Sequence, residues 1–295
     1  MKLQFAKMHG AGNDFIVVDD TPARRTYSPE QIRKLCRRRT GIGADGLISL
    51  QALPDSSAVR MSFFNCDGSR ASLCGNGLRC AAAFAGKYGL AEGPFIRFVT
   101  DSGILCAELL GNNQVRIELP LTEDFQEYPS LPSDEGAGIR MKGYRGVVGV
   151  PHFVLPLPDV SDIDLPALGR SIRFHRLFTP GGVNVDFVQD PAGLPEGSPL
   201  PIRTYERGVE GETLACGTGI ASAACALWKF RGSPGKQTFL CRSGDLIQVE
   251  ITANGSIVNK IHLTGPAAVA FTGECGDDEE EGGNPPSTTP PQSLP

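Results

Sequence analysis

The chain has 295 residues, 40% of them hydrophobic and 21% charged, which is the composition of a soluble globular protein with one large domain or two ordinary ones. Its formal net charge is -5 at pH 7, but Gly276–Pro295 hold five acidic residues and no base, so the rest of the chain is neutral. A neutral body argues against a general nucleic-acid or membrane surface, and no apolar run approaches the ~20 residues of a membrane span.

The N-terminus and the nine cysteines bear on location. MKLQFAKMHG has interspersed polar residues and does not resemble a signal peptide. The cysteines are odd in number, and their spacings match neither a disulfide framework nor a CxxC zinc pair. We therefore expect a cytoplasmic protein with reduced cysteines and no metal site.

The first elements are two strands and a helix. Leu3–Lys7 alternates apolar and polar residues, and Phe15–Val18 is a continuous apolar run typical of a buried strand. Asn13, in the turn between them, either shapes the turn or points toward a ligand. Ser28-Pro29-Glu30-Gln31 has the form of a capping box, which predicts a helix to about Arg39. The glycines of TGIGADGL then end that helix and turn the chain.

Two copies of one pattern dominate the rest of the chain. LCGNGLRCAAAFAGKYG covers residues 73–89 and ACGTGIASAACALWKFRG covers residues 215–232. In each copy Cys-Gly-x-Gly precedes a run of small and apolar residues, which predicts a buried helix that begins at the glycines. Cys74 and Cys216 then lie at helix N-termini, where the partial positive charge lowers the pKa of a thiol and bare N–H groups can bind a carboxylate.

Short strands surround these helices. The strands expected before residue 120 are Val59–Phe64, Phe95–Thr100, Ile104–Leu110 and Gln114–Leu119, and Asn65 follows the first of them just before Cys74. Pro-, Glu- and Ser-rich residues 122–138 are interpreted as a linker. The later strands are expected at Gly143–Val150, Val183–Gln189, Ile202–Arg207, Phe239–Leu240, Leu246–Ile251, Ser256–Leu263 and Val269–Thr272. A helix wrapped by mostly antiparallel strands, present twice, predicts an α+β fold of two related halves.

Three polar groups after the linker are candidates for a site. His152 follows a proline at an expected strand edge, and its ordinary pKa makes it a usable proton partner, although a lone histidine is more often structural. Glu206 and Arg207 precede the second cysteine. Arg207 could bind a substrate carboxylate while Glu206 binds an amine or tunes a thiol; alternatively both are surface residues.

Paired thiols suit a particular reaction. One thiolate can remove a proton from one face of a carbon while a thiol returns one to the opposite face, which inverts a stereocentre. A carboxylate held on both helix N-termini would stabilise the charge that develops when the α-proton leaves. This arrangement requires no organic cofactor.

Seven motifs, in the family's order, make the chain similar to diaminopimelate epimerases over about residues 1 to 274: KMHGAGNDF, GIGADGL, FFNCDGS, CGNGLRC, VPHFV, GVNVDF and YERGVEGETLACGTGIAS. The resemblance implies two pseudo-symmetric domains, residues 1–120 completed by about 264–274 and residues 121–263. It also implies a homodimer and cofactor-independent interconversion of LL- and meso-diaminopimelate in lysine and cell-wall precursor synthesis. The tail at residues 276–295 has no apolar content to bury and is expected to be disordered.

Site residues carry over by motif. The resemblance implies that Cys74 and Cys216 are the acid/base pair and that His152 and Glu206 assist them. The substrate-binding residues that it implies are Asn13, Asn65, Gly75, Asn76, Asn184, Glu206, Arg207, Gly217 and Thr218.

Two positions depart from the family pattern. Val150 stands where many members have asparagine, and Gly46 stands where some have glutamine. A related two-cysteine racemase of another amino acid, for example histidine, is therefore an alternative. A non-catalytic module that binds an amino acid in the same cleft is a third.

Overall fold

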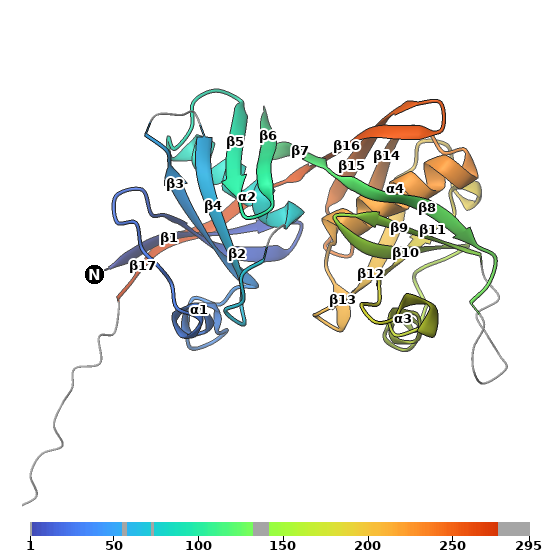
Figure 1. Ribbon diagram of the computed structural model, residues 1–295, viewed down its shortest axis with the longest axis horizontal. Helices are drawn as coiled ribbons and strands as arrows, with labels where there is room; N and C mark the ends of the chain where they lie inside the picture. The colour runs from blue at the N-terminus through green and yellow to red at the C-terminus, as the bar shows by residue number, and fades with distance from the viewer. Residues whose placement is uncertain (1, 55–57, 72–73, 132–141, 277–295) are drawn as a thin grey trace, which may run out of the picture.

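The computed structural model describes residues 2–54, 58–71, 74–131 and 142–276. The described chain forms two lobes side by side, each built around one of the motif helices (Figure 1). These are α2 (Gly75–Lys87) in the first lobe and α4 (Gly217–Arg231) in the second. Within the described ranges, no helix is both long and apolar enough to cross a membrane.

The first lobe wraps α2 in strands, and α1 (Pro29–Cys36) lies on its outside (Figure 1). The capping box predicted for α1 is present, with Gln31 N 3.2 Å from Ser28 Oγ and Ser28 N 2.8 Å from Gln31 Oε1. The strands are β1 (Leu3–Gly10), β2 (Asn13–Asp19), β3 (Gly46–Ala52), β4 (Ala58–Asn65), β5 (Phe95–Thr100), β6 (Gly103–Gly111) and β7 (Gln114–Leu119).

The second lobe repeats this plan around α4, and α3 (Leu165–Arg173) takes the outer position. Two short 3-10 turns lie at Arg176–Phe178 and Pro191–Gly193. The strands are β9 (Gly143–Val148), β10 (Val150–Leu157), β11 (Asn184–Gln189), β12 (Leu200–Glu206), β13 (Gly211–Thr213), β14 (Lys236–Leu240), β15 (Leu246–Asn254) and β16 (Ile257–Pro266).

The chain crosses between the lobes twice. β8 (Leu121–Tyr128) follows β7 but pairs with β9 of the second lobe, and β17 (Ala268–Cys275) follows β16 but pairs with β1 of the first. β7 and β16 pair with each other across the junction. The lobes are therefore joined by two chain crossings and by the β7–β16 pairing rather than by one tether.

The strand pairings run in the same order in both lobes. β2 pairs in parallel with β3, and β3 pairs antiparallel with β4; β10, β11 and β12 repeat these two pairings. The chain then passes through the central helix to a parallel strand, from β4 to β5 and from β12 to β14. The remaining pairings are antiparallel, so the predicted fold class of two pseudo-symmetric, mostly antiparallel halves is confirmed.

Small apolar residues let strands pack against both central helices. Residues 75–82 of α2 are all buried, and so is the run from Gly219 to Leu227 in α4. One hydrophobic cluster includes Phe98 and Ile117 of the first lobe and Phe239 and Val249 of the second. Because protein interiors are close-packed, this shared core holds the two helix starts in a definite relation.

Several sequence expectations were wrong. The expected linker contains β8 at Leu121–Tyr128, where the backbone pairs with β9 although Phe125 alone of these side chains is buried. β3 was missed because the glycines of TGIGADGL indicated only a turn, whereas Gly46–Ala52 is a strand between β2 and β4. α3 was not expected. The rest of the linker, at residues 132–141, and the tail from residue 277 lie outside the described residues.

Two boundaries also differ. The first helix ends at Cys36 rather than Arg39, because Arg37 is extended (φ -62°, ψ 122°). His152 does not lie at a strand edge; it is inside β10, between Gly146 of β9 and Asn184 of β11. An interior position makes its ring wholly buried.

Candidate active site

Both motif cysteines occupy the residue immediately before a helix, as the pattern predicts. Cys74 and Cys216 have extended backbone and are the N-caps of α2 and α4. Gly77 N donates a hydrogen bond to Cys74 Sγ over 3.3 Å. Side-chain capping leaves other first-turn N–H groups available, so each thiol stands beside donors that favour an anion.

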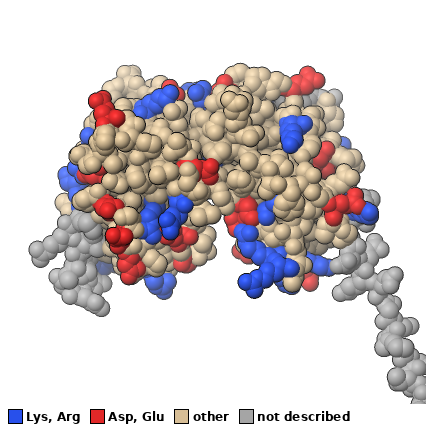
Figure 2. Space-filling view, turned by 180° about the vertical axis from the view of Figure 1, so that it is seen from behind, with Lys and Arg blue, Asp and Glu red and all other residues tan. Residues whose placement is uncertain are grey.

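The two helix starts meet through Asn76. Its Nδ2 donates to Asn13 Oδ1 over 3.2 Å and to the carbonyl oxygen of Ala215, the residue before Cys216, over 3.1 Å. A β-carbon built on Gly217 would lie 3.4 Å from Asn76 Oδ1. The Cys-Gly-x-Gly turns are thus side by side, and the surface is hollowed between the two lobes that carry them (Figure 2).

A buried polar chain leads away from Cys216. Its Sγ lies 3.5 Å from Thr218 Oγ1, which is 3.0 Å from His152 Nε2. His152 Nδ1 lies 2.7 Å from Asp186 Oδ2. Asp186 Oδ1 in turn accepts a hydrogen bond from Thr204 Oγ1 over 2.8 Å. Because His152 and Asp186 are fully buried, water does not compete for these contacts.

The first lobe has apolar residues in place of that polar chain. In the equivalent strand pairs, Phe15 faces Gly46 where His152 faces Asn184. The same register places Ile48 at the position of Asp186. It also places Phe63, opposite Ile48, at the position of Thr204, opposite Asp186. The rings of Phe15 and Phe63 pack edge to face with centroids 5.8 Å apart, so these positions form hydrophobic core instead of a hydrogen-bonded chain.

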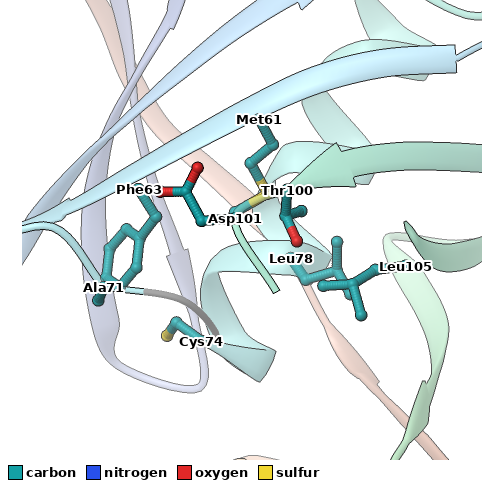
Figure 3. A pocket seen from close by; sticks show the side chains of 8 residues that line it. All are labelled: Met61, Phe63, Ala71, Cys74, Leu78, Thr100, Asp101 and Leu105. Carbon is teal, nitrogen blue, oxygen red and sulfur yellow. The ribbon is translucent and has the colours of Figure 1, made fainter. Parts of the chain in front are cut away.

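The pocket beside Cys74 is too small for a substrate. Its interior has room for about one water molecule. Figure 3 shows Cys74 at the start of α2, with Phe63, Leu78 and Leu105 among the side chains that line this pocket. This pocket is lined by Cys74 and not by Cys216, so it does not hold a ligand that contacts both cysteines.

Asn13 is held by charged residues of the first lobe. Its Nδ2 donates to Asp45 Oδ2 over 2.8 Å, while its Oδ1 lies 3.8 Å from Cys74 Sγ. Arg38 binds both Asp14 and Asp45 with nitrogen–oxygen distances of 2.8 Å. This network orients the carboxamide of Asn13 toward the thiol.

The residues expected at the far end of the substrate differ in how free they are. Asn184 Oδ1 accepts a hydrogen bond from the backbone N of Arg207 over 2.7 Å, and its Nδ2 lies 3.5 Å from His152 Nε2. Asn184 is therefore engaged within the protein. The Arg207 guanidinium makes one 3.4 Å contact, with Gly181 O, and no ion pair within the described ranges. It can bind a carboxylate. Asn65 Nδ2 donates to Ser69 Oγ over 3.0 Å.

Burial sets the protonation of the thiols. It raises the pKa of Cys74 to about 11 and the pKa of Cys216 well above its ordinary value. Burial also raises the pKa of Glu206, whose negative charge opposes ionisation of both thiols, while Asp186 adds a similar effect at Cys216. Without a ligand both thiols are protonated at neutral pH. An added proton acceptor or positive charge is needed before either becomes a base.

The two positions that depart from the family pattern have different structural meanings. A β-carbon on Gly46 would lie 2.5 Å from the carbonyl oxygen of Phe64 and 2.7 Å from Phe63 Cε2, so packing requires glycine there. Val150 is half-buried at the start of β10. It leaves an apolar surface where an asparagine would offer a hydrogen bond.

Three residues of the site were not predicted from the sequence. Asp186 could have been found, because Asn184 and Asp186 are two apart on a strand and share a face. Asp45 gave no signal before its contact with Asn13 was known. Arg79 lies in an otherwise apolar stretch of α2, and nothing local in the sequence indicates its partners. Within the described chain, no group of three or more His, Cys, Asp or Glu side chains is placed to hold a metal ion.

The fold is shared with several solved structures. A phenazine biosynthesis protein of the PhzF family from Bacillus anthracis matches with a TM-score of 0.68 at 13% identity, covering 93% of this chain and 99% of that one. A hydroxyproline epimerase from Agrobacterium vitis matches with a TM-score of 0.60 at 17% identity, covering 93% and 91%. These matches define the class of proteins with this fold, in which two related lobes are each built around a central helix.

Sequence comparison identifies the family. The family model described as diaminopimelate epimerase matches residues 5–119 and 146–269. The diaminopimelate epimerase of Aquifex aeolicus is 38% identical over 292 residues, covering 94% of this chain and 99% of its own. That of Methanocella arvoryzae is 37% identical over 288 residues, covering 94% and 98%. The chain therefore belongs to the diaminopimelate epimerase family and is an isomerase.

Proposed function

We propose that this enzyme interconverts LL- and meso-diaminopimelate by moving a proton between Cys74, Cys216 and the α-carbon of the substrate. The observation that supports this most strongly is the pair of cysteines at two adjoining helix N-termini. A substrate carboxylate bound to the N–H groups of Gly75, Asn76, Gly217 and Thr218 would present its α-carbon to both sulfurs.

The proton transfer balances without an external oxidant or cofactor. One thiolate takes the α-proton, and the electron pair left on carbon delocalises into the carboxylate, whose developing charge the helix N-termini stabilise. The opposite thiol donates its proton to the other face of the carbon. The configuration is inverted, and the second cysteine is left as the thiolate.

The chain of contacts from Cys216 gives that thiol a proton acceptor. Asp186 accepts the Nδ1–H of His152, so we assign the neutral tautomer whose Nε2 is free to accept a proton. Cys216 can then pass its proton through Thr218 Oγ1 to His152. Asp186 would stabilise the imidazolium that results, and we propose that Glu206 binds the substrate ammonium group.

The outer part of the hollow would hold the second amino-acid end of the substrate. Arg207 supplies a guanidinium without an ion-pair partner in the described structure, and Asn13 and Asn65 supply amide groups. We propose that Arg207 binds the distal carboxylate. Asn184 then acts by holding Arg207 and His152.

The remaining features of the proposal follow from family membership and strand pairing. We infer two domains, residues 1–120 completed by about 264–274 and residues 121–263, because β17 pairs with β1. We also propose that the enzyme is a cytoplasmic homodimer that needs no cofactor and serves lysine and cell-wall precursor synthesis.

Solvent exchange tests the proposal directly. Purified protein incubated with LL-diaminopimelate in D₂O, without added cofactor, should incorporate deuterium at the α-carbon and accumulate the meso isomer. Absence of exchange throughout pH 6 to 9 would refute it. A substrate panel tests the alternative that Val150 suggests, since faster exchange on histidine or another monocarboxylic amino acid would indicate a racemase.

The same assay separates a catalyst from a binding module. Cys74→Ala and Cys216→Ala should each abolish conversion of LL- to meso-diaminopimelate if the protein is an epimerase. Amino-acid binding with no exchange by the wild type, retained in both variants, would indicate a non-catalytic module.

A further inference from the structure

Arg79 is a fully buried cation on α2, and it is not bonded to any carboxylate in the described structure. Its Nη2 donates to Asn76 Oδ1 over 3.0 Å and its Nε to the carbonyl oxygen of Pro266 over 3.3 Å. Its Nη1 is buried without a hydrogen-bond partner. A buried charge without a counter-charge is costly, and a cation near a helix N-terminus also opposes the helix dipole. The free-energy cost of burying this charge suggests that Arg79 has a function that outweighs it.

The guanidinium lies where the two lobes join. β-carbons built on Gly10 of β1, Gly265 of β16 and Gly217 of α4 would lie 3.1, 3.3 and 3.8 Å from its nitrogens. Three glycines thus make room for one side chain at the junction. The position five residues after the other motif cysteine holds Ala221, so the second lobe has no equivalent cation.

The charges of the two lobes complement each other at the thiols. The second lobe contributes Asp186 and Glu206, both of which oppose ionisation of Cys216, whereas Arg79 favours ionisation of Cys74. Arg79 also donates a hydrogen bond to Asn76, whose Nδ2 donates to Asn13 and to Ala215 O. Its charge and its hydrogen bond therefore act on the same helix start.

We propose that Arg79 is a positioning residue of the epimerase: it fixes Asn76 between the two helix starts and supplies the positive charge that balances the Cys74 thiolate and the reacting carboxylate. This role rests on the proposed function. The buried guanidinium gains a counter-charge when an anion is present at the start of α2, and this anion is either the Cys74 thiolate or the substrate carboxylate.

The charged groups around this pair are few. Glu206 of β12 acts on Cys74 from across the site, and Arg79 acts on it from α2 itself. Cys74 and Cys80 of α2 act on Arg79, as do Cys241 and Asp245 from the turn between β14 and β15. Arg79 is the only cation among the principal influences on the pKa of Cys74, so its removal should raise that pKa further.

Alkylation of Cys74 tests the charge without any substrate. Iodoacetamide labelling from pH 7 to 11, with tandem mass spectrometry to localise the adduct, measures the pKa of this thiol in the wild type, Arg79→Met and Arg79→Lys. Arg97→Met, on the exposed face of β5, is the matched control. Deuterium exchange into LL-diaminopimelate is measured on the same proteins.

Arg79→Met should slow Cys74 alkylation at pH 8 on the order of tenfold, since one pKa unit changes the thiolate fraction about tenfold. Arg79→Lys should keep the alkylation profile but lower kcat, because lysine keeps the charge and loses the geometry that holds Asn76. Arg97→Met should match the wild type in both assays.

Specific results would overturn the proposal. A folded Arg79→Met protein whose Cys74 profile stays within twofold of the wild type would do so. If Arg79→Met does not fold, the test rests on Arg79→Lys. A shifted pH profile of Cys74 alkylation in Arg79→Lys, or a kcat equal to that of the wild type, would refute the positioning role of Arg79. A wild type that alkylates as expected but exchanges no deuterium would instead contradict the proposed function.

Discussion

The two cysteines share one backbone setting but have different layers beneath them. Under Cys216 the equivalent strand positions hold His152, Asp186 and Thr204, all joined by hydrogen bonds within reach of Thr218. Under Cys74 they hold Phe15, Ile48 and Phe63, which pack as hydrophobic core. The comparison teaches that a duplicated fold can place two thiols at equivalent helix starts while only one of them has a chain of polar side chains beneath it.

The charged side chains that act on the two cysteines also differ. Among those in the described structure, only carboxylates act on Cys216, whereas Cys74 is acted on by the carboxylate of Glu206 and by one cation, Arg79. Cys216 is thus expected to ionise by passing its proton to His152, and Cys74 with part of its negative charge balanced by Arg79. Each prediction below either breaks this contrast or sharpens it, beginning with the largest effect.

Loss of either thiol should have the same large effect on activity, although the two thiols have different surroundings. Cys74→Ala and Cys216→Ala should each lower kcat for epimerisation by about 10³-fold or more, because removal of a group that transfers the proton costs at least the usual contribution of an acid or base. Conversion of LL- to meso-diaminopimelate is the measurement. Far more activity in one variant than in the other would mean that a single base serves both faces.

Replacing His152 should make the second lobe resemble the first. His152→Phe should lower kcat about 10²-fold, since Cys216 loses its acceptor. The effect on kcat/KM must be equal in both directions, because the equilibrium constant is unchanged. Alkylation of Cys74 should follow the wild-type pH profile. Phe15→Leu, at the equivalent position, is the control for loss of packing and should keep most activity.

The second glycine of each Cys-Gly-x-Gly motif should respond differently to one added methyl group. A β-carbon on Gly219 would overlap Asp186 Oδ1, whereas on Gly77 it would lie 3.3 Å from Ile48 Cδ1. Gly219→Ala should destabilise the protein by about 2 kcal/mol and lower kcat at least tenfold. Gly77→Ala should stay within about 1 kcal/mol of the wild type, because alanine favours the helix. Urea unfolding and turnover are the measurements.

Glu206 and Asp186 should be distinguishable by which thiol pKa each of them affects. Glu206 opposes ionisation of both thiols, and Asp186 acts on Cys216. Asp186→Asn should therefore lower the pKa of Cys216 and leave that of Cys74 unchanged, whereas Glu206→Gln should lower both. Below the pKa, alkylation accelerates about tenfold for each unit by which the pKa falls. A Cys74 profile that moves in Asp186→Asn would contradict this division.

The cysteines in the hydrophobic cores of the two lobes should not differ in the way that Cys74 and Cys216 do. Burial raises the pKa of Cys36 and Cys80 in the first lobe, and of Cys225 and Cys241 in the second, from 9.0 to about 12. Unfolded thiols ionise near pH 9 while native ones keep their protons. The stability due to these groups is therefore complete below pH 9 and is lost as the pH rises toward 12.

The alkaline loss can be apportioned between the lobes. At pH 10 each buried thiol should have lost about 1 kcal/mol of unfolding free energy. Urea unfolding at pH 8 and pH 10 measures the sum, and Cys80→Ala and Cys225→Ala should each reduce the difference by the same amount. Unequal reductions would show that one core admits water more readily.

Local sequence patterns were sufficient for the elements that carry their own signals. The duplicated Cys-Gly-x-Gly runs predicted both central helices with the cysteines at their starts, and Ser28 with Gln31 predicted the cap of α1. Strands with clear turn residues, such as β5 and β7, were predicted with their observed bounds. These features depend on neighbours within a few residues, so the chain encodes them locally.

Elements and contacts that depend on distant partners were missed or misjudged. β8 and β3 form because β9, β2 and β4 offer them hydrogen bonds, although their own residues suggested a linker and a turn. The burial of His152 inside β10 likewise required its neighbours.

By itself the sequence determined the two helix starts, their thiols and, through motifs in order, the family. Only the tertiary structure decided that Asp186 lies under Cys216, that Ile48 takes its place under Cys74, and that Arg79 closes the junction between the lobes. The physical reason is range. A helix start is a property of consecutive residues, whereas a proton acceptor or a counter-charge exists only where strands far apart in sequence bring two side chains together.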